Sequence, residues 1–334
     1  MMKTRPVLFC AFIFLLLFGF VSDAASQGVK RASPANQITD AKTAVSELRK
    51  LYKLRDFESG YERGRKLVER FPENMELKAL FIQNMARNGM SKEAVKVAEK
   101  LIENEKENAW AWFALANAYL RNAQNKEAVP AVEKALKLMP DHEDFIFLHA
   151  SLLMAQKKYD EIYAWLDNNS PKIKDQSKLL QIKGNAEYRQ STDGKFDEAK
   201  RKMSFETFAK AIEISPNFVY AIYLYGSYLS QDKRFAEALP LLKKAAALSP
   251  RVAHIREALW RAMLNGQPSK TEEYRKTEVV ADMNSLMRLR PDSVNILETV
   301  GLFYERELKM PDKKKELDAV ILKNFPNRRG RNEF

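Results

Sequence analysis

The residues best suited to acid–base or metal chemistry are few: three histidines and one cysteine, among interspersed carboxylates. His142 has the densest acidic surroundings, because it lies in the sequence DHED at 141–144. One interpretation is a metal or acid–base site. The other is the acidic first turn of a helix, where carboxylates complement the helix dipole. We favour the helix start, because the sequence has no second cluster with metal-ligand spacing.

Motifs of the common enzyme classes are absent from the sequence: G-x-S-x-G, the P-loop, G-x-G-x-x-G and H-E-x-x-H. Acid–base catalysis also needs carboxylates positioned in a closed pocket. The sequence therefore predicts a protein that is not an enzyme, with no catalytic residues, no cofactor and no metal.

The N-terminus has the pattern of a secretory signal peptide. Lys3 and Arg5 precede an apolar run over 7–21, and Ser22-Asp23-Ala24 predicts cleavage after Ala24. The alternative is an uncleaved anchor, but 15 apolar residues fall short of the roughly 20 that span a bilayer. Cys10 lies in this run, so no disulfide framework is expected. We expect export to the periplasm, the cell envelope or the medium.

The charge balance bears on the choice of partner. The chain carries 56 Lys and Arg and 44 Asp and Glu, a net charge of +12. This excess favours acidic partners, anionic polymers or nucleic acid. Because the acidic residues are interspersed, there is no concentrated basic stripe, and we expect no nucleic-acid partner.

An internal repeat organises the chain, and its clearest copy is 108–142. Apolar and small residues recur there at helical spacing on two predicted helices, and a proline closes the unit. These residues are Trp112, Leu115, Ala116 and Tyr119, then Ala128, Val132 and Ala135, and finally Pro140. The segment resembles the tetratricopeptide repeat (TPR), whose pattern is W-x2-L-G-x2-Y, A-x3-F and P. Ala116 replaces the usual Gly, and Val132 the usual Phe.

Closing prolines give the register of the other copies. Pro72 and Pro140 are two units of 34 residues apart, and Pro216 and Pro250 are one unit apart. After the signal peptide (1–24) and a polar linker (25–40) that ends at the predicted N-cap Asp40, eight units and a tail (329–334) follow. The predicted units are 41–74, 75–108, 109–142, 143–176, 177–218, 219–252, 253–293 and 294–328.

The fifth and seventh units are longer than 34 residues. We expect their second helices to be extended, after short loops at 191–194 and 265–269. Pro130 and Pro240 occupy equivalent places, which we expect near the start of a second helix, where a lost amide bond costs least. Because one hairpin cannot bury both apolar stripes, neighbouring units must stack. The fold class implied by the resemblance is an all-α, right-handed superhelical solenoid of about eight repeats.

The resemblance also implies a ligand-binding concave groove, lined by fixed positions of each first helix. Carried onto this sequence, those positions give a candidate peptide-binding or partner-binding surface of aromatic, amide and arginine side chains. Its residues are Trp110, Phe113, Asn117, Arg121, Phe147, Ser151, Asn185, Tyr188, Arg189, Tyr220, Tyr223 and Arg261. The alternative for several of these aromatics is ordinary packing between repeats. A two-carboxylate clamp is incomplete, because Phe113 stands where that clamp needs Lys.

A second candidate surface is a basic ledge on the two long units. It would consist of Lys195, Lys200, Arg201 and Lys202 together with Lys270, Arg275 and Lys276. A solvated helix face explains the same charges, and we favour it.

The function that follows is a non-catalytic protein-interaction scaffold, which binds an extended peptide or a partner helix along its groove. Its partners would be proteins or peptides of envelope assembly, secretion or polysaccharide-export machinery, by analogy with the family. Two alternatives remain. The chain is the repeat module of a larger enzyme or complex, or it binds an anionic envelope polysaccharide.

Overall fold

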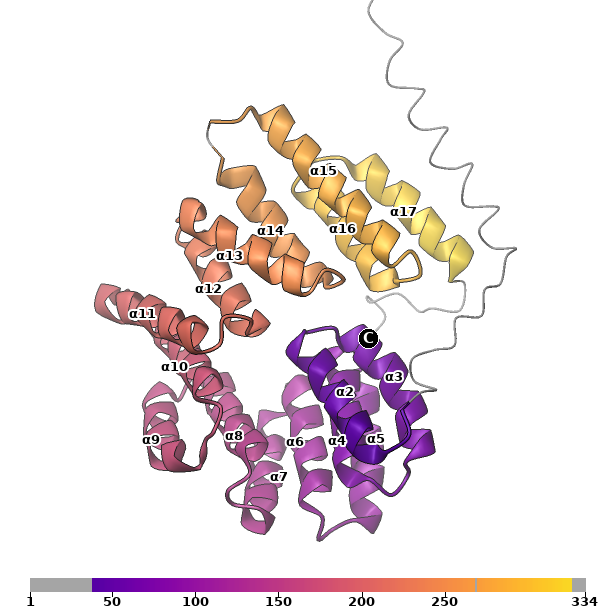
Figure 1. The fold of residues 1–334 in the computed structure, drawn as a ribbon, viewed down its shortest axis with the longest axis vertical. Coiled ribbons are helices and arrows are strands. Elements are labelled where there is room, and N and C mark those ends of the chain that lie inside the picture. The colour runs from indigo at the N-terminus through magenta and orange to yellow at the C-terminus, as the bar shows by residue number, and fades with distance from the viewer. Residues whose placement is uncertain (1–37, 268, 326–334) are drawn as a thin grey trace, which may run out of the picture. The chain divides into compact units, whose positions relative to one another are not determined.

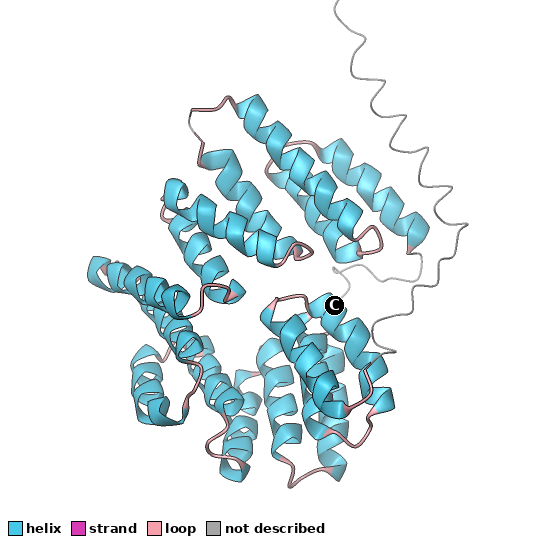
Figure 2. Ribbon diagram, viewed as in Figure 1, coloured by secondary structure: helices cyan, strands magenta, loops and turns pink. Residues whose placement is uncertain are grey.

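The computed structural model describes residues 38–267 and 269–325, so the predicted signal peptide, Cys10, most of the linker and the tail lie outside the described residues. Asp40 to Phe334 forms one compact unit. Its described part is all-α and contains sixteen α-helices and one short 3-10 helix at Ser170–Lys172 (Figures 1 and 2).

The helices form eight antiparallel pairs. The first helices of the pairs are α2 (Ala41–Lys53), α4 (Met75–Arg87), α6 (Ala109–Arg121), α8 (Glu143–Ala155), α10 (Gln176–Gln190), α12 (Val219–Gln231), α14 (Ala253–Asn265) and α16 (Val294–Arg306). The second helices are α3 (Phe57–Arg70), α5 (Ser91–Asn104), α7 (Asn125–Leu138), α9 (Tyr159–Asn169), α11 (Glu198–Ile214), α13 (Phe235–Leu248), α15 (Glu272–Leu289) and α17 (Pro311–Asn324). Each first helix begins within one residue of a predicted unit start, so the units keep their numbers below.

Polar caps and prolines set the helix boundaries. The predicted N-cap Asp40 is confirmed, because its carboxylate accepts the amide of Thr43 at 2.9 Å. Asn74 and Asn108 cap α4 and α6 in the same way, which satisfies amides that a helix start leaves free. Five closing prolines lie, as predicted, in turns between units: Pro72, Pro140, Pro216, Pro250 and Pro291.

The turn inside each pair repeats one backbone conformation. Arg55, Gly89, Ala123 and Lys157 have φ of 64°, 89°, 60° and 60°, and they are spaced 34 residues apart. Lys233 and Lys309 repeat it later. A left-handed residue just after a helix C-terminus reverses the chain, so that the second helix can pack against the first.

The two long units have the expected extended second helices. α11 has 17 residues and α15 has 18, whereas the other second helices have 11 to 14. The prediction for Pro130 and Pro240 was wrong in one respect. Each is the sixth residue of its helix, α7 or α13, and so lies beyond the amides that a helix start leaves free. Each proline therefore removes an interior hydrogen bond.

Contacts also join units that are distant in sequence. Leu54, in the α2–α3 turn, packs against the core of units five to eight, and its carbonyl accepts the Ser249 hydroxyl at 2.7 Å. Arg290, after α15, donates to the Ser59 hydroxyl at 3.2 Å, and Ser293 donates to Glu58 at 2.7 Å. The first unit is therefore bonded to the ends of the sixth and seventh units.

Candidate functional site

A cavity of about 890 Å³ lies where the first helices of units one to six converge. Its walls come from α2, α4, α6, α8, α10 and α12, and from the α2–α3 and α11–α12 turns. We call it the concave cavity. The repeat explains its composition, because equivalent positions of successive first helices all face the same space.

Eight of the twelve predicted groove residues line the concave cavity. They are Phe113, Asn117, Arg121, Phe147, Ser151, Asn185, Arg189 and Tyr220. Four others are not among its lining residues: Trp110, Tyr188, Tyr223 and Arg261. Ligand binding by any of them stays a prediction.

The two predicted phenylalanines belong mainly to the walls. Phe113 is 2% exposed and Phe147 3% exposed. Phe113 packs against Phe145 with ring centroids 5.0 Å apart, and the Lys178 ammonium covers the Phe147 ring at 4.2 Å. Their edges shape the cavity, whereas most of their area holds the repeats together.

The four residues outside the lining have partners of their own. Trp110 meets the Phe145 ring edge-on at 5.1 Å, and Tyr188 stacks on Tyr228 at 3.6 Å. Tyr223 meets the ring of His254 edge-on at 5.3 Å. Arg261 is exposed and pairs with Glu257 and Glu307 at 2.7 and 3.0 Å. Packing between repeats, the alternative weighed for the aromatics, describes these contacts.

Polar side chains form a ladder along the cavity wall. Gln83 and Asn117 are one repeat apart, and the Gln83 amide donates to Asn117 Oδ1 at 3.3 Å. Asn117 and Ser151 then donate to backbone carbonyls of their own helices at 3.0 and 2.8 Å. These bonds fix the side chains in place, so they present a pre-organised polar surface to a ligand.

One carboxylate of the chain already occupies part of the cavity. Asp144 accepts from Arg49 at 2.6 Å and from Lys178 at 3.3 Å. Burial alone would raise the pKa of Asp144, but Lys178 and Arg49 lower it to about 2. Asp144 is therefore ionised at neutral pH and neutralises part of the positive charge around it.

Sequence reasoning missed two cationic residues of the lining, Arg55 and Arg87. Arg87 stands one 34-residue repeat before Arg121, so the same register could have found it. Arg55 lies in the α2–α3 turn, and no first-helix position corresponds to it. Burial would raise the pKa of Tyr52 beside them, yet Arg87, Arg55 and Lys178 lower it.

The histidines have structural surroundings. His142 caps α8, with its Nδ1 accepting the Asp144 amide at 3.3 Å, which confirms the preferred interpretation of DHED as a helix start. The ring of His149 packs on that of Trp165 at 4.1 Å. Within 38–267 and 269–325, no group of three or more His, Cys, Asp or Glu could hold a metal ion.

His254 makes the stability of the protein depend on pH. Burial, then Arg55 and Arg87, lower its pKa from 6.5 to about 3. Below pH 6.5 the unfolded chain binds a proton that the folded chain refuses, so this contribution is complete above pH 6.5 and is lost as the pH falls toward 3. We expect a slope of up to about 1.4 kcal/mol per pH unit in that window.

Urea unfolding between pH 7.5 and 4 checks this expectation, with His254→Gln as the comparison. The variant should lack this part of the slope, so the difference in stability between the two proteins should shrink on acidification. Parallel curves would show that His254 does not set the dependence. Asp144 should contribute only at lower pH, between about 3.8 and 2.

The proposed basic ledge is not supported in one of its members. Arg201 is 7% exposed, donates to Ser191 at 2.8 Å and pairs with Asp232, so it belongs to the core of the long fifth unit. Lys270 and Lys276 pair with Glu278 and Glu272 at 3.0 and 2.5 Å. These pairs fit the solvated helix face that we favoured.

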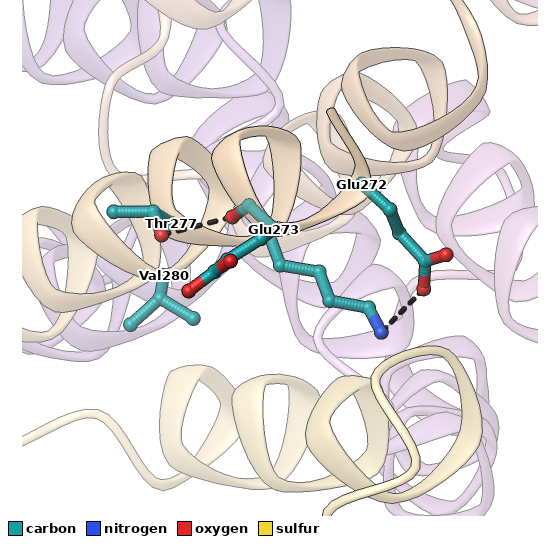
Figure 3. A pocket seen from close by; sticks show the side chains of 5 residues that line it. Glu272, Glu273, Thr277 and Val280 are labelled. Atoms are coloured by element: carbon teal, nitrogen blue, oxygen red, sulfur yellow. Dashed lines mark hydrogen bonds and ion pairs between the residues drawn. The ribbon is translucent and has the colours of Figure 1, made fainter. Parts of the chain in front are cut away.

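A second hollow, of about 530 Å³, lies on α15 (Figure 3). It is lined by Glu272, Glu273, Lys276, Thr277 and Val280. Lys276 pairs with Glu272, and the Thr277 hydroxyl donates to the Glu273 carbonyl at 2.9 Å. Because these polar groups satisfy one another on a single helix, the concave cavity is the stronger candidate site. In the described part of the chain, no helix has both the length and the apolar character that crossing a bilayer requires.

Comparisons with known proteins agree with this architecture. Residues 87–169 match the family model described as anaphase-promoting complex, cyclosome, subunit 3. Among curated proteins, none matches the sequence significantly.

Solved structures match over most of the chain. The APC/C hetero-tetramer Cut9–Hcn1 gives a TM-score of 0.56 at 14% identity, covering 86% of this chain and 54% of that one. The human IFIT1 dimer with PPP-AAAA gives 0.51 at 14% identity, covering 80% and 64%. The pilus biogenesis factor PilW gives 0.43 at 14% identity, covering 76% and 94%. This chain thus spans between half and two thirds of the first two structures. The described part of the chain has the fold of a tetratricopeptide-repeat solenoid.

Proposed function

We propose that the protein is a non-catalytic interaction scaffold that binds an extended peptide, or a partner helix, in the concave cavity. The observation that carries this proposal is the convergence of six first helices on one space. Its lining combines apolar walls, fixed amides and cations, as in sites that hold peptides by side-chain pockets and hydrogen bonds. The TPR fold supports the general function, because repeat solenoids use extended concave surfaces for binding.

A photo-crosslinking amino acid placed at Ser151, inside the cavity, tests this function in native cells. The same group at Lys137, on the exposed side of α7, provides the matched control. We expect crosslinks to one defined partner segment from position 151 only. Leu120→Trp, which narrows the cavity, should abolish them while leaving the circular dichroism spectrum unchanged. Equal crosslinking from both positions, or crosslinks that survive Leu120→Trp, would contradict peptide binding in the cavity.

We also propose that the scaffold works in the periplasm or cell envelope, where it would serve envelope assembly, secretion or polysaccharide export. The basic start and the apolar run over 7–21 support this location. Cell fractionation with N-terminal sequencing tests it, and the expected mature protein begins at Ala25. Recovery in the cytoplasm with Met1 retained would refute it.

The excess of cations in the cavity keeps one alternative open, binding of an anionic envelope polysaccharide. In that case, binding of a purified anionic glycan should fall steeply with salt and should compete with the crosslinks from position 151. Absence of glycan binding at low salt would remove this alternative.

A further inference from the structure

Three arginines from different elements meet in the concave cavity. Arg87 and Arg121 are the last residues of α4 and α6, and Arg55 lies in the α2–α3 turn. Burial and then Arg87 lower the pKa of Arg121 to about 10. Burial likewise lowers the pKa of Arg55, with a further contribution from Arg87. The three positive charges are therefore close enough to repel one another. We call them the arginine cluster.

No aspartate or glutamate of the described residues forms an ion pair with the arginine cluster. The groups that act on these arginines are tyrosines and other arginines. Nε of Arg55 and Nε of Arg87 are buried without a hydrogen-bond partner. A buried, charged donor that lacks a partner carries a free-energy penalty, which an anion in the cavity would remove.

The opposite wall of the same cavity shows the paired arrangement. There, Asp144 lies between Arg49 and Lys178, at 2.6 and 3.3 Å. The other two carboxylates of the lining are also used by the fold. Glu143 accepts the amide of Lys174 at 2.7 Å, and Asp175 caps α10. The lining as a whole contains seven Lys and Arg against three Asp and Glu, so its net charge is positive.

We propose that the arginine cluster binds the side-chain carboxylate of an Asp or Glu within an acidic peptide segment that occupies the concave cavity. This inference rests on the peptide-binding function proposed above and names the chemistry of its ligand. Guanidinium groups present paired donors that match a carboxylate, so three of them provide both affinity and orientation.

The aromatic residues of the lining favour a peptide over a nucleic acid. Single-stranded nucleic acids bind largely by stacking bases on open aromatic faces. Here the Arg55 guanidinium covers the Tyr220 ring at 4.0 Å, and the Lys178 ammonium covers Phe147 at 4.2 Å. Phe113 is 2% exposed. These faces are already occupied, whereas the fixed amides and apolar edges suit a peptide backbone and its side chains.

Fluorescence anisotropy tests the proposal with a short labelled peptide of alternating Asp and Leu, acetylated and amidated so that no terminal carboxylate is present. The comparison peptide has Asn in place of every Asp. We expect the acidic peptide to bind at low salt at least about tenfold more tightly than the Asn peptide. Arg87→Gln with Arg121→Gln should lower its affinity by about tenfold or more, which corresponds to about 1.4 kcal/mol.

The control is Arg65→Gln with Arg288→Gln, which removes the same charge from two exposed surface positions. It should bind like the unmodified protein. Arg121→Gln alone, at a side chain exposed to the cavity, should show a smaller loss without risk to folding. As a second readout, the bound carboxylate should raise the pKa of His254, because it offsets the charges of Arg55 and Arg87; NMR titration of that histidine measures it.

Three outcomes would overturn the inference. They are absence of binding by the acidic peptide, equal binding of the Asn peptide, and equal losses in the two double variants. Tighter binding of a 5′-phosphorylated RNA oligonucleotide that depends on Arg87 and Arg121 would assign the cluster to nucleic acid instead. The proposed function fails separately, through the crosslinks at Ser151 and Lys137, so crosslinking without acidic-peptide binding would leave the scaffold intact and reject only this ligand.

Discussion

Trp260→Ala is expected to lower the free energy of unfolding by about 3–5 kcal/mol, the range for removing a buried Trp or Phe. Trp260 has an exposed fraction of 0% and meets the ring of Phe303 edge-on at 5.1 Å. Its indole N–H donates to Asp282 at 2.7 Å, and the same carboxylate pairs with Arg256. The substitution therefore leaves a cavity and removes a hydrogen bond from a buried ion pair.

Because repeats in a solenoid contact mainly their neighbours, the loss should concentrate in the last units. Urea unfolding gives the total, and amide hydrogen exchange should show faster exchange over 253–325 than over 75–155. Leu322→Ala, at a side chain that is 72% exposed on α17, serves as the control and should change stability by less than about 0.5 kcal/mol. A loss below about 1 kcal/mol for Trp260→Ala would mean that this core repacks.

Arg290→Met should detach the seventh unit from the first. The Arg290 side chain is 10% exposed and donates to Ser59 at 3.2 Å and to Glu62 at 3.4 Å, and Glu58 lies at 3.7 Å. Removing it leaves Glu58 and the buried Ser59 hydroxyl without this partner. We expect a loss of about 2–3 kcal/mol, below the full range for a broken buried pair because Glu62 is 56% exposed.

The detachment should also be visible as a change in dimensions. Small-angle X-ray scattering should give a larger radius of gyration for Arg290→Met than for the unmodified protein. A double-mutant cycle with Glu58→Gln measures the coupling between the two units. Arg288→Met, at an exposed neighbour on α15, should change neither quantity. An unchanged radius of gyration together with zero coupling would show that the contact does not hold the units together.

The 34-residue register made the helix pairs predictable. Local chemistry sets their boundaries: Asp40 and Asn74 cap helices, and prolines stop them. Because every unit reuses the same positions, one clear copy at 108–142 located the others. The depth of Pro130 within its helix escaped this reasoning, since it depends on where the preceding turn ends.

The candidate site was only partly predictable, because position in a repeat gives the direction of a side chain but not its surroundings. Phe113 faces the concave side, as expected, yet neighbouring rings bury it. Arg121 was found through the register, and Arg87 could have been. Arg55 could not, since its turn reaches the cavity through contacts with units that follow about 160 residues later.

The bonds from the first unit to Ser249 and Arg290 have a consequence for how such a chain can evolve. An open repeat array gains or loses whole units by duplication and deletion, because each unit contacts only its neighbours. Here Leu54 and Glu58 must meet partners at the ends of the sixth and seventh units. Inserting or deleting a unit between them would separate those partners, so the number of repeats is fixed by contact and should resist change even while their sequences diverge.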